Sequence, residues 1–180
     1  MEKSNIGEKI KLLTGSGMWH TREAEELPSV HLSDGPHGLR KQEEKERQNN
    51  VSLVSTCYPT ASALACSWDV TAAERLGRAV AKEAWNADVA VLLGPGINMK
   101  RSPLCGRNFE YFSEDPFLAG RLGAAYVSAA QGENVAVSLK HFAANNQETN
   151  RQTANSQVDE RALREIYLSA FEYVVKTARP

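Results

Sequence analysis

The sequence predicts an α/β fold, namely a partial (β/α)8 barrel of the TIM type, about the first half of the barrel. Apolar strand-like runs alternate with segments of helical periodicity, which indicates βαβ units and a parallel sheet covered on both faces. Polar residues follow the predicted strands directly, where such barrels place their functional sites. Neither GxGxxG nor GxxxxGKS/T follows a strand, which disfavours a nucleotide-binding fold.

The N-terminal part of the chain contains two predicted helices, one strand and one charged loop. Residues 6–13 carry apolar positions at helical spacing and stop before Gly15. The stretch LPSVHLSDG predicts a short strand at 30–32, closed by an Asp-Gly-Pro turn. Residues 41–50 are heavily charged and predict a solvated loop. The segment 69–85 predicts a helix from four apolar positions: Val70, Leu76, Val80 and Ala84.

The C-terminal part continues the same alternation. The apolar run ADVAVLLGPG predicts a strand ended by Gly-Pro-Gly, and an irregular polar loop follows at 97–115. A helix begins at Asp115-Pro116, because proline suits a first turn, and it runs to about Gln131. A strand at 135–139 leads into a second polar loop. The last helix starts at Asp159, and its predicted inner face is formed by Ala162, Leu163, Ile166, Ala170, Phe171 and Val174.

The predicted elements are too few for a closed barrel. About four strands can be counted, whereas a closed barrel of this type needs eight. The chain also stops at Pro180, directly after a helix, where the next strand is expected. We therefore expect residues 1–180 to be the truncated N-terminal part of a barrel domain. The missing C-terminal part of the barrel is then expected to be its structural partner.

Composition excludes several classes of function. The 180 residues are 42% hydrophobic and 24% charged, with a formal net charge of −1, so nothing in the charge balance favours nucleic-acid binding. The apolar runs are too short to span a membrane, and the N-terminus is too charged for a secretory signal. The three cysteines lack metal-ligand spacing. These features predict a cytoplasmic protein without a metal site.

Charged side chains converge on the predicted strand ends. Asp34 and Arg40 lie in SDGPHGLR, after the first strand. Arg107 lies in the loop after the second strand, with Arg101 as a competitor for the same role. Lys140 and His141 end the third strand, and Arg151 lies in the loop beyond. Carboxylate, guanidinium, ammonium and imidazole groups together suit the hydroxyls of a sugar.

Three motifs in this order resemble one known family. LSDGPHGLR, GRNFEYFSEDP and KHFAANNQETNR are similar to the N-terminal barrel of family 3 glycoside hydrolases, the β-glucosidase-like enzymes, and the resemblance covers nearly the whole chain. It implies that the barrel binds the terminal sugar of a β-glucoside or oligosaccharide. The substrate-binding residues that it implies are Asp34, Arg40, Arg107, Lys140, His141 and Arg151.

The resemblance also implies a retaining mechanism with two carboxylates roughly 5 Å apart. The family's nucleophile is an Asp in a Ser-Asp-Trp-like motif on a later strand, and its acid/base Glu belongs to a following α/β sandwich domain. This sequence contains neither; Asp69 and Asp88 lie in helix-start and strand-start contexts. We therefore expect no catalytic residue within this chain, an inactive isolated chain, and no cofactor.

Three classes of function remain open from the residues alone. The first is a hydrolase of terminal β-D-glucosyl residues, with β-xylosidase-type specificity as an alternative. The second is a non-catalytic carbohydrate-binding remnant. The third is an unrelated barrel enzyme with Lys140 as a Schiff-base amine, which the polar surroundings of Lys140 disfavour.

Several residues also have a structural interpretation. Arg107 could form a surface ion pair with Glu110 or Glu114. Tyr111 and Phe112 could stack on a sugar or pack in the core. In addition, His37 lies close enough in sequence to orient Asp34, and Asn145 and Asn146 are expected to tie their loop to its neighbours.

Lys140 and His141 raise a geometric requirement. Successive residues on a regular strand point to opposite faces, so both can reach one sugar only if the backbone departs from regular β geometry. We predict such a distortion at 140–142, with a non-proline cis peptide bond as the form that the family resemblance suggests.

Overall fold

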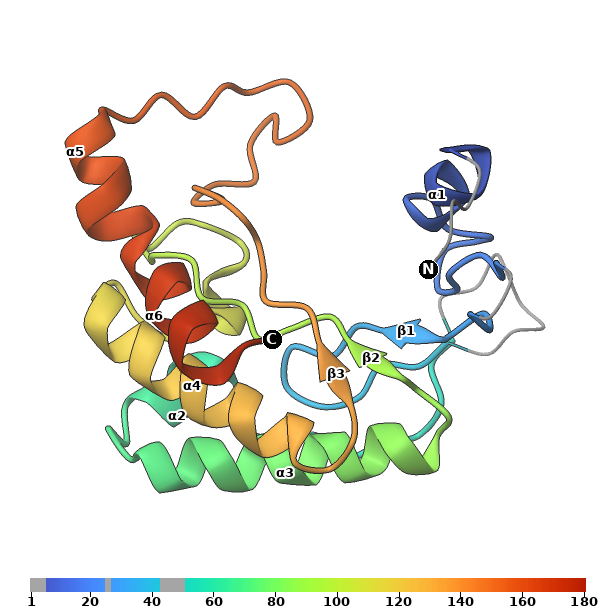
Figure 1. The fold of residues 1–180 in the computed structure, drawn as a ribbon. Helices are drawn as coiled ribbons and strands as arrows, with labels where there is room; N and C mark the ends of the chain where they lie inside the picture. Colours follow the sequence, from blue (N-terminus) through green and yellow to red (C-terminus); the bar gives the residue numbers. More distant parts are fainter. Residues whose placement is uncertain (1–5, 25–26, 43–50) are drawn as a thin grey trace.

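The computed structural model describes residues 6–24, 27–42 and 51–180. Three short strands form a parallel sheet in the order β1-β2-β3: β1 (Leu32–Ser33), β2 (Val91–Leu92) and β3 (Ala136–Val137). Leu32 pairs with Val91, and Val91 pairs with Ala136. The predicted parallel order is confirmed, and the fold is a partial TIM-type barrel (Figure 1).

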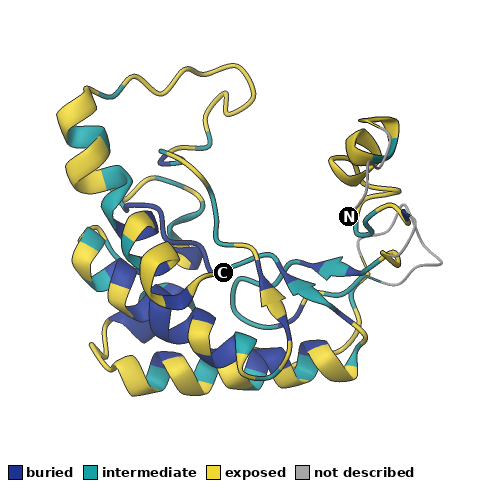
Figure 2. Cartoon of the chain, in the orientation of Figure 1, coloured by how far each residue is buried: buried dark blue, intermediate teal, exposed yellow. Residues whose placement is uncertain are grey.

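Three helices build the main helical layer. They are α3 (Val70–Asn86), α4 (Pro116–Gln131) and α6 (Ser169–Ala178), and α4 packs against both of the others (Figure 1). The approach of α3 to α4 is very close at Gly77, where an added Cβ would lie 2.4 Å from the Tyr126 carbonyl oxygen. Figure 2 shows the buried residues gathered between these helices and the sheet. The helices thus hold the sheet, and the loops after its strands, in place.

Aspartates begin the predicted helices. Asp69 accepts a hydrogen bond from Thr71 N (2.8 Å), and Asp115 caps α4, with its carboxylate accepting from Leu118 N (3.0 Å). Asp159 is the N-cap of α5 (Glu160–Ala162). A carboxylate at this position satisfies backbone N–H groups that have no partner within the helix. The predicted helix starts are therefore confirmed.

Other elements differ from the prediction. The strands cover only two residues each, whereas longer strands were expected, as at 135–139. The sequence analysis missed the short helices α2 (Ala61–Ala65) and η1 (Asn108–Glu110). The last helical segment is interrupted by a π-helix, η2 (Leu163–Tyr167), and Ile166 of the predicted inner face is exposed, whereas Ala170, Phe171 and Val174 are buried.

The N-terminal helix α1 (Ile6–Leu12) buries none of its residues and lies away from the main helical layer (Figures 1 and 2). The predicted charged loop at 41–50 falls outside the described residues from position 43 onward. Within the described ranges, no helix combines the length and the apolar character that crossing a membrane requires.

Candidate functional site

The segments that follow β2 and β3 run side by side beyond the strands. Ile97 N donates to Lys140 O (2.9 Å), and Lys140 N donates to Pro95 O (3.2 Å). Gly96 bridges to both Lys140 and Tyr111, and an added Cβ there would lie 2.9 Å from the Tyr111 ring. Glycine at this position therefore lets the Tyr111 ring lie directly against the backbone that follows β2.

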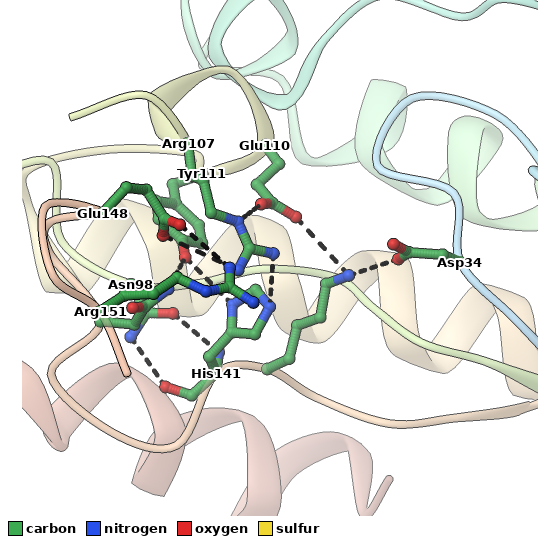
Figure 3. Close-up of polar contacts among 10 residues, drawn as sticks. Asp34, Asn98, Arg107, Glu110, Tyr111, His141, Glu148 and Arg151 are labelled. Atoms are coloured by element: carbon green, nitrogen blue, oxygen red, sulfur yellow. Dashed lines mark hydrogen bonds and ion pairs between the residues drawn. The ribbon is translucent and has the colours of Figure 1, made fainter. Parts of the chain in front are cut away.

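Lys140 lies between two carboxylates (Figure 3). Its Nζ is 2.5 Å from Asp34 Oδ1 and 3.6 Å from Glu110 Oε2, and Glu110 is only 4% exposed. Burial alone would raise the pKa of Asp34, but the hydrogen bond and charge of Lys140, the Gly35 N–H and the charge of Arg40 lower it overall. Asp34 is therefore a carboxylate at neutral pH.

Arg107 is held on three sides. Its Nε donates to Glu110 Oε1, its Nη2 lies 2.7 Å from His141 Nε2, and its Nη1 lies 3.9 Å from Glu148 Oε1 (Figure 3). Burial would lower the pKa of Arg107, but the hydrogen bond and charge of Glu110, with smaller contributions from the charges of Tyr111 and Glu148, raise it overall. The guanidinium is thus a fixed cation.

His141 is a neutral imidazole with a defined tautomer. Burial, and then the charges of Arg107 and Lys140, lower its pKa to about 4. Because a guanidinium only donates hydrogen bonds, Nε2 must accept from Arg107, and the ring proton lies on Nδ1. Nδ1 donates to Tyr111 Oη (3.0 Å), which also accepts from Asn145 Nδ2 (2.8 Å). Burial raises the pKa of Tyr111 to about 12, so it remains a phenol.

The backbone of His141 is fixed by Asn98. The Asn98 amide nitrogen donates to His141 O (2.9 Å), and His141 N donates to Asn98 Oδ1 (2.7 Å). The Lys140–His141 and Phe142–Ala143 peptide bonds are both cis. The predicted departure from regular β geometry is therefore confirmed, and the side chains of Lys140 and His141 both take part in the cluster.

The structure brings four of the six predicted site residues together, and two lie at the margin. Arg40 is exposed and contacts Asp34 through its backbone, because its N–H donates to Asp34 O (2.8 Å). The Arg151 side chain is 52% exposed and donates to Glu148 Oε2 (3.0 Å). The residues that form the centre are Asp34, Arg107, Lys140 and His141.

The competition between the two arginines of the long loop is resolved. Arg101 is exposed, and its guanidinium lies 3.4 Å from Tyr167 Oη, away from His141. The ion pair of Arg107 with Glu110, considered as a surface contact, does exist, but it is wrong to place it on the surface because Glu110 is buried.

The remaining structural expectations have mixed outcomes. Tyr111 and Phe112 are both buried, so they pack in the core rather than form an open stacking surface. Asn145 and Asn146 tie their loop to its neighbours as expected, since Asn146 Nδ2 donates to Met99 O. His37, expected to orient Asp34, instead contacts the ring of Phe109 edge-on at 5.9 Å.

Charges of opposite sign alternate through the site. The sequence analysis considered Glu110 only as a surface ion-pair partner of Arg107 and Tyr111 only as a stacking or core residue, and it missed Glu148 and Asn98. The three-residue spacing from Arg107 to Glu110 was the sequence signal for their ion pair. Across the described residues, no group of three or more His, Cys, Asp or Glu is arranged to hold a metal ion. The ion pairs form one chain of alternating charges, in which each residue pairs with the next: Asp34, Lys140, Glu110, Arg107, Glu148 and Arg151.

Comparison with known proteins identifies the family. The family model described as "Glycosyl hydrolase family 3 N terminal domain" matches residues 35–179. This chain belongs to glycosyl hydrolase family 3. The family resemblance of the three motifs is therefore confirmed over most of the chain.

Individual curated relatives match nearly the whole chain. The "Thermostable beta-glucosidase B" of Acetivibrio thermocellus is 52% identical over an alignment of 184 positions, which covers 100% of this chain and 24% of the relative. The "Exo-alpha-(1->6)-L-arabinopyranosidase" of Bifidobacterium longum is 47% identical over 97% of this chain and 24% of its own length. The chain thus spans about a quarter of the length of the curated relatives that it matches.

The solved structure of a similar protein shows the same fold. The Kluyveromyces marxianus beta-glucosidase, solved in complex with glucose, superposes with a TM-score of 0.89 at 44% identity, over 99% of this chain and 21% of that one. The partial barrel described above thus corresponds to one segment of a much longer polypeptide in that enzyme.

Proposed function

We propose that this chain forms the part of a glycoside hydrolase active site that binds the terminal sugar, for cleavage of non-reducing terminal β-D-glucosyl residues by a retaining mechanism. In this proposal Asp34, Arg107, Lys140 and His141 bind sugar hydroxyls. Arg40 and Arg151 support the site from its margin. The relatives named beta-glucosidases and the glucose complex of a homologue support the substrate class.

One observation carries the proposal: the site presents two facing donor–acceptor pairs. The Lys140 ammonium donates and the Asp34 carboxylate accepts, 2.5 Å apart. The Arg107 guanidinium donates and the neutral Nε2 of His141 accepts, 2.7 Å apart. A hydroxyl both donates and accepts, so each pair is the complement of one hydroxyl, and two such pairs suit a polyhydroxylated ring.

The catalytic carboxylates of the retaining reaction are expected outside this chain. Retention requires two carboxyl groups about 5 Å apart that flank the glycosidic bond. Asp69 is the N-cap of α3, and Asp88 follows the end of that helix at a positive φ of 55°, so both have structural positions. Asp34 and Glu110 are engaged by cations. The chain's own contribution is therefore binding and orientation of the sugar.

The alternative of a barrel enzyme with Lys140 as a Schiff-base amine is disfavoured by the surroundings of Lys140. A Schiff-base lysine needs an apolar site that favours the uncharged amine. Lys140 instead lies between two carboxylates, Asp34 and Glu110, so its surroundings are polar and charged. A second candidate activity comes from a relative: the arabinopyranosidase at 47% identity supports a pentopyranoside as an alternative substrate.

A chimeric enzyme tests the proposal. Residues 1–180 would replace the matching segment of the Acetivibrio thermocellus relative, with which they share 52% identity. We expect hydrolysis of an aryl β-D-glucoside with a higher kcat/KM than that of the aryl β-D-xyloside and the aryl α-L-arabinopyranoside. Preference for either pentoside would replace the glucosidase assignment, and a folded chimera inactive on all three would support the non-catalytic alternative.

A further inference from the structure

Glu110 connects the two donor–acceptor pairs of the site. One of its carboxylate oxygens pairs with Lys140 Nζ at 3.6 Å, and the other accepts from Arg107 Nε (Figure 3). We infer that Glu110 is a positioning residue, which sets the separation between the Lys140–Asp34 pair and the Arg107–His141 pair. This inference rests on the proposed sugar-binding function of the site.

The burial of Glu110 argues against direct contact with a ligand. Its side chain is 4% exposed, compared with 26% for Asp34 and 22% for Arg107. Both of its oxygens already face cations. Glu110 therefore acts through Lys140 and Arg107, and removing its charge changes the ligand site only by changing these two side chains.

The backbone that carries Glu110 is anchored to a neighbouring helix. Glu110 ends the short helix η1, and the carbonyl of Asn108 in that helix accepts from Ser62 Oγ of α2 (2.9 Å). Lys100 Nζ donates to the same Ser62 Oγ (2.5 Å), and Asn108 Nδ2 donates to Ser102 O (2.7 Å). The carboxylate is thus presented from a fixed point rather than from a free loop.

Replacement by glutamine would isolate the role of the charge. The amide keeps the shape of the side chain, but its nitrogen only donates hydrogen bonds. Lys140 and Arg107 are also pure donors, so an amide can accept from one cation and must present its NH2 group to the other. One of the two contacts is lost, and the two cations repel each other without a carboxylate between them.

The test is a mutant cycle in the chimeric enzyme, with ligand affinity as the readout. Calorimetry would measure binding of a glucose-configured iminosugar, which does not require turnover. Glu110→Gln should weaken binding at least tenfold. If Glu110 acts through its two partners, this factor should shrink at least threefold in a Lys140→Ala or an Arg107→Ala background. Glu133→Gln is the matched control, because Glu133 pairs with Arg78 (3.1 Å) outside the site and should leave affinity unchanged.

Each outcome decides the inference. A factor of the same size in all backgrounds indicates a purely structural role and overturns it, as does near-wild-type affinity of Glu110→Gln. Glu110→Asp, which keeps the charge, would enter the same cycle if the glutamine variant does not fold by circular dichroism. A chimera that binds the iminosugar with this coupling but does not hydrolyse glycosides would refute the proposed function alone, whereas one that fails to bind refutes both.

Discussion

Arg107 and His141 face each other with Nη2 2.7 Å from Nε2, although 34 residues separate them in the chain. The contact is favourable only if the imidazole is neutral and accepts at Nε2. Tyr111 completes the arrangement by accepting from Nδ1. The cation and the imidazole therefore fix each other's hydrogen-bonding roles, and the expected behaviour of both residues follows from this contact.

Arg107 and Arg101 form a natural pair of test positions. Arg107→Ala in the chimeric enzyme should lower kcat/KM by at least a hundredfold, about 3 kcal/mol of transition-state stabilisation, because it removes the partner of both Glu110 and His141. Arg101→Ala should change kcat/KM less than about threefold, since Arg101 is exposed and contacts Tyr167 instead. Steady-state kinetics decide between them. Equal effects of the two substitutions would show that the wrong arginine has been placed in the site.

The Asp34–Lys140 pair gives a second prediction. Lys140→Ala and His141→Ala should each reduce kcat/KM by a hundredfold or more. Asp34→Ala should do at least as much, because it leaves the surrounding cations unbalanced. Lys176→Ala, which breaks an exposed pair on α6, is the control and should have no effect. Circular dichroism would confirm that the variants fold. Near-wild-type kinetics for the Lys140 and His141 variants would then show that both residues have only a structural role.

The 180-residue chain by itself should have no glycosidase activity. Its aspartates at positions 69 and 88 serve helix α3 and the turn after it, and its buried carboxylate at Glu110 is engaged by cations. None of these three carboxylates is therefore free to act as the nucleophile or the proton donor of the proposed retaining reaction. The purified chain would be assayed on an aryl β-glucoside beside a heat-inactivated sample. Turnover above that background would mean that the chain contains catalytic residues after all.

His141 should titrate far below an ordinary histidine. Its pKa of about 4, against 6.5 for the unperturbed group, follows from burial and from the charges of Arg107 and Lys140. The unfolded chain then binds this proton at a higher pH than the folded chain, so the contribution of His141 to stability falls as the pH drops from about 6.5 towards 4. NMR titration of the imidazole resonances, assigned with His141→Asn, measures the pKa. A value near 6.5 would contradict the neutral donor–acceptor pairing.

Gly77 should be required where α3 meets α4. An added Cβ would lie 2.4 Å from the Tyr126 carbonyl oxygen, so Gly77→Ala should lower the free energy of unfolding by roughly 1–3 kcal/mol despite the better helix propensity of alanine. Gly106→Ala is the control, because an added Cβ there meets nothing within 4 Å. Denaturant unfolding of the two variants would compare them, and equal stabilities would contradict the close helix contact.

The strand order and the principal helices could be predicted because they follow from local patterns. Asp69, Asp115 and Asp159 precede apolar periodic segments, and all three are helix N-caps in the structure. The clustering of Asp34, Arg107, Lys140 and His141 could be predicted because parallel strands place their C-terminal ends at one edge. Arg101 and Arg107 could not be separated, since both lie in one irregular loop without periodicity.

The inward orientation of the partner residues escaped prediction for a different reason. Glu110 and Asn98 lie in the same loop as many other polar residues, and nothing in a linear sequence marks which of them turn inward. Their roles depend on contacts such as Asn98 with His141, 43 residues away. The strand lengths were overestimated because apolar character persists beyond the residues that pair, as in 87–96 around β2.

The contact between Lys140 and Asp34 spans 106 positions of the chain, so it closes a loop that contains β2 and helices α3 and α4. The entropy of closing so long a loop is recovered only when the intervening elements have packed. During synthesis on a ribosome, Asp34 is made before helices α3 and α4, and Lys140 is made after both of them. We therefore expect the Lys140–Asp34 contact to form late in folding, after the strands of the parallel sheet have paired.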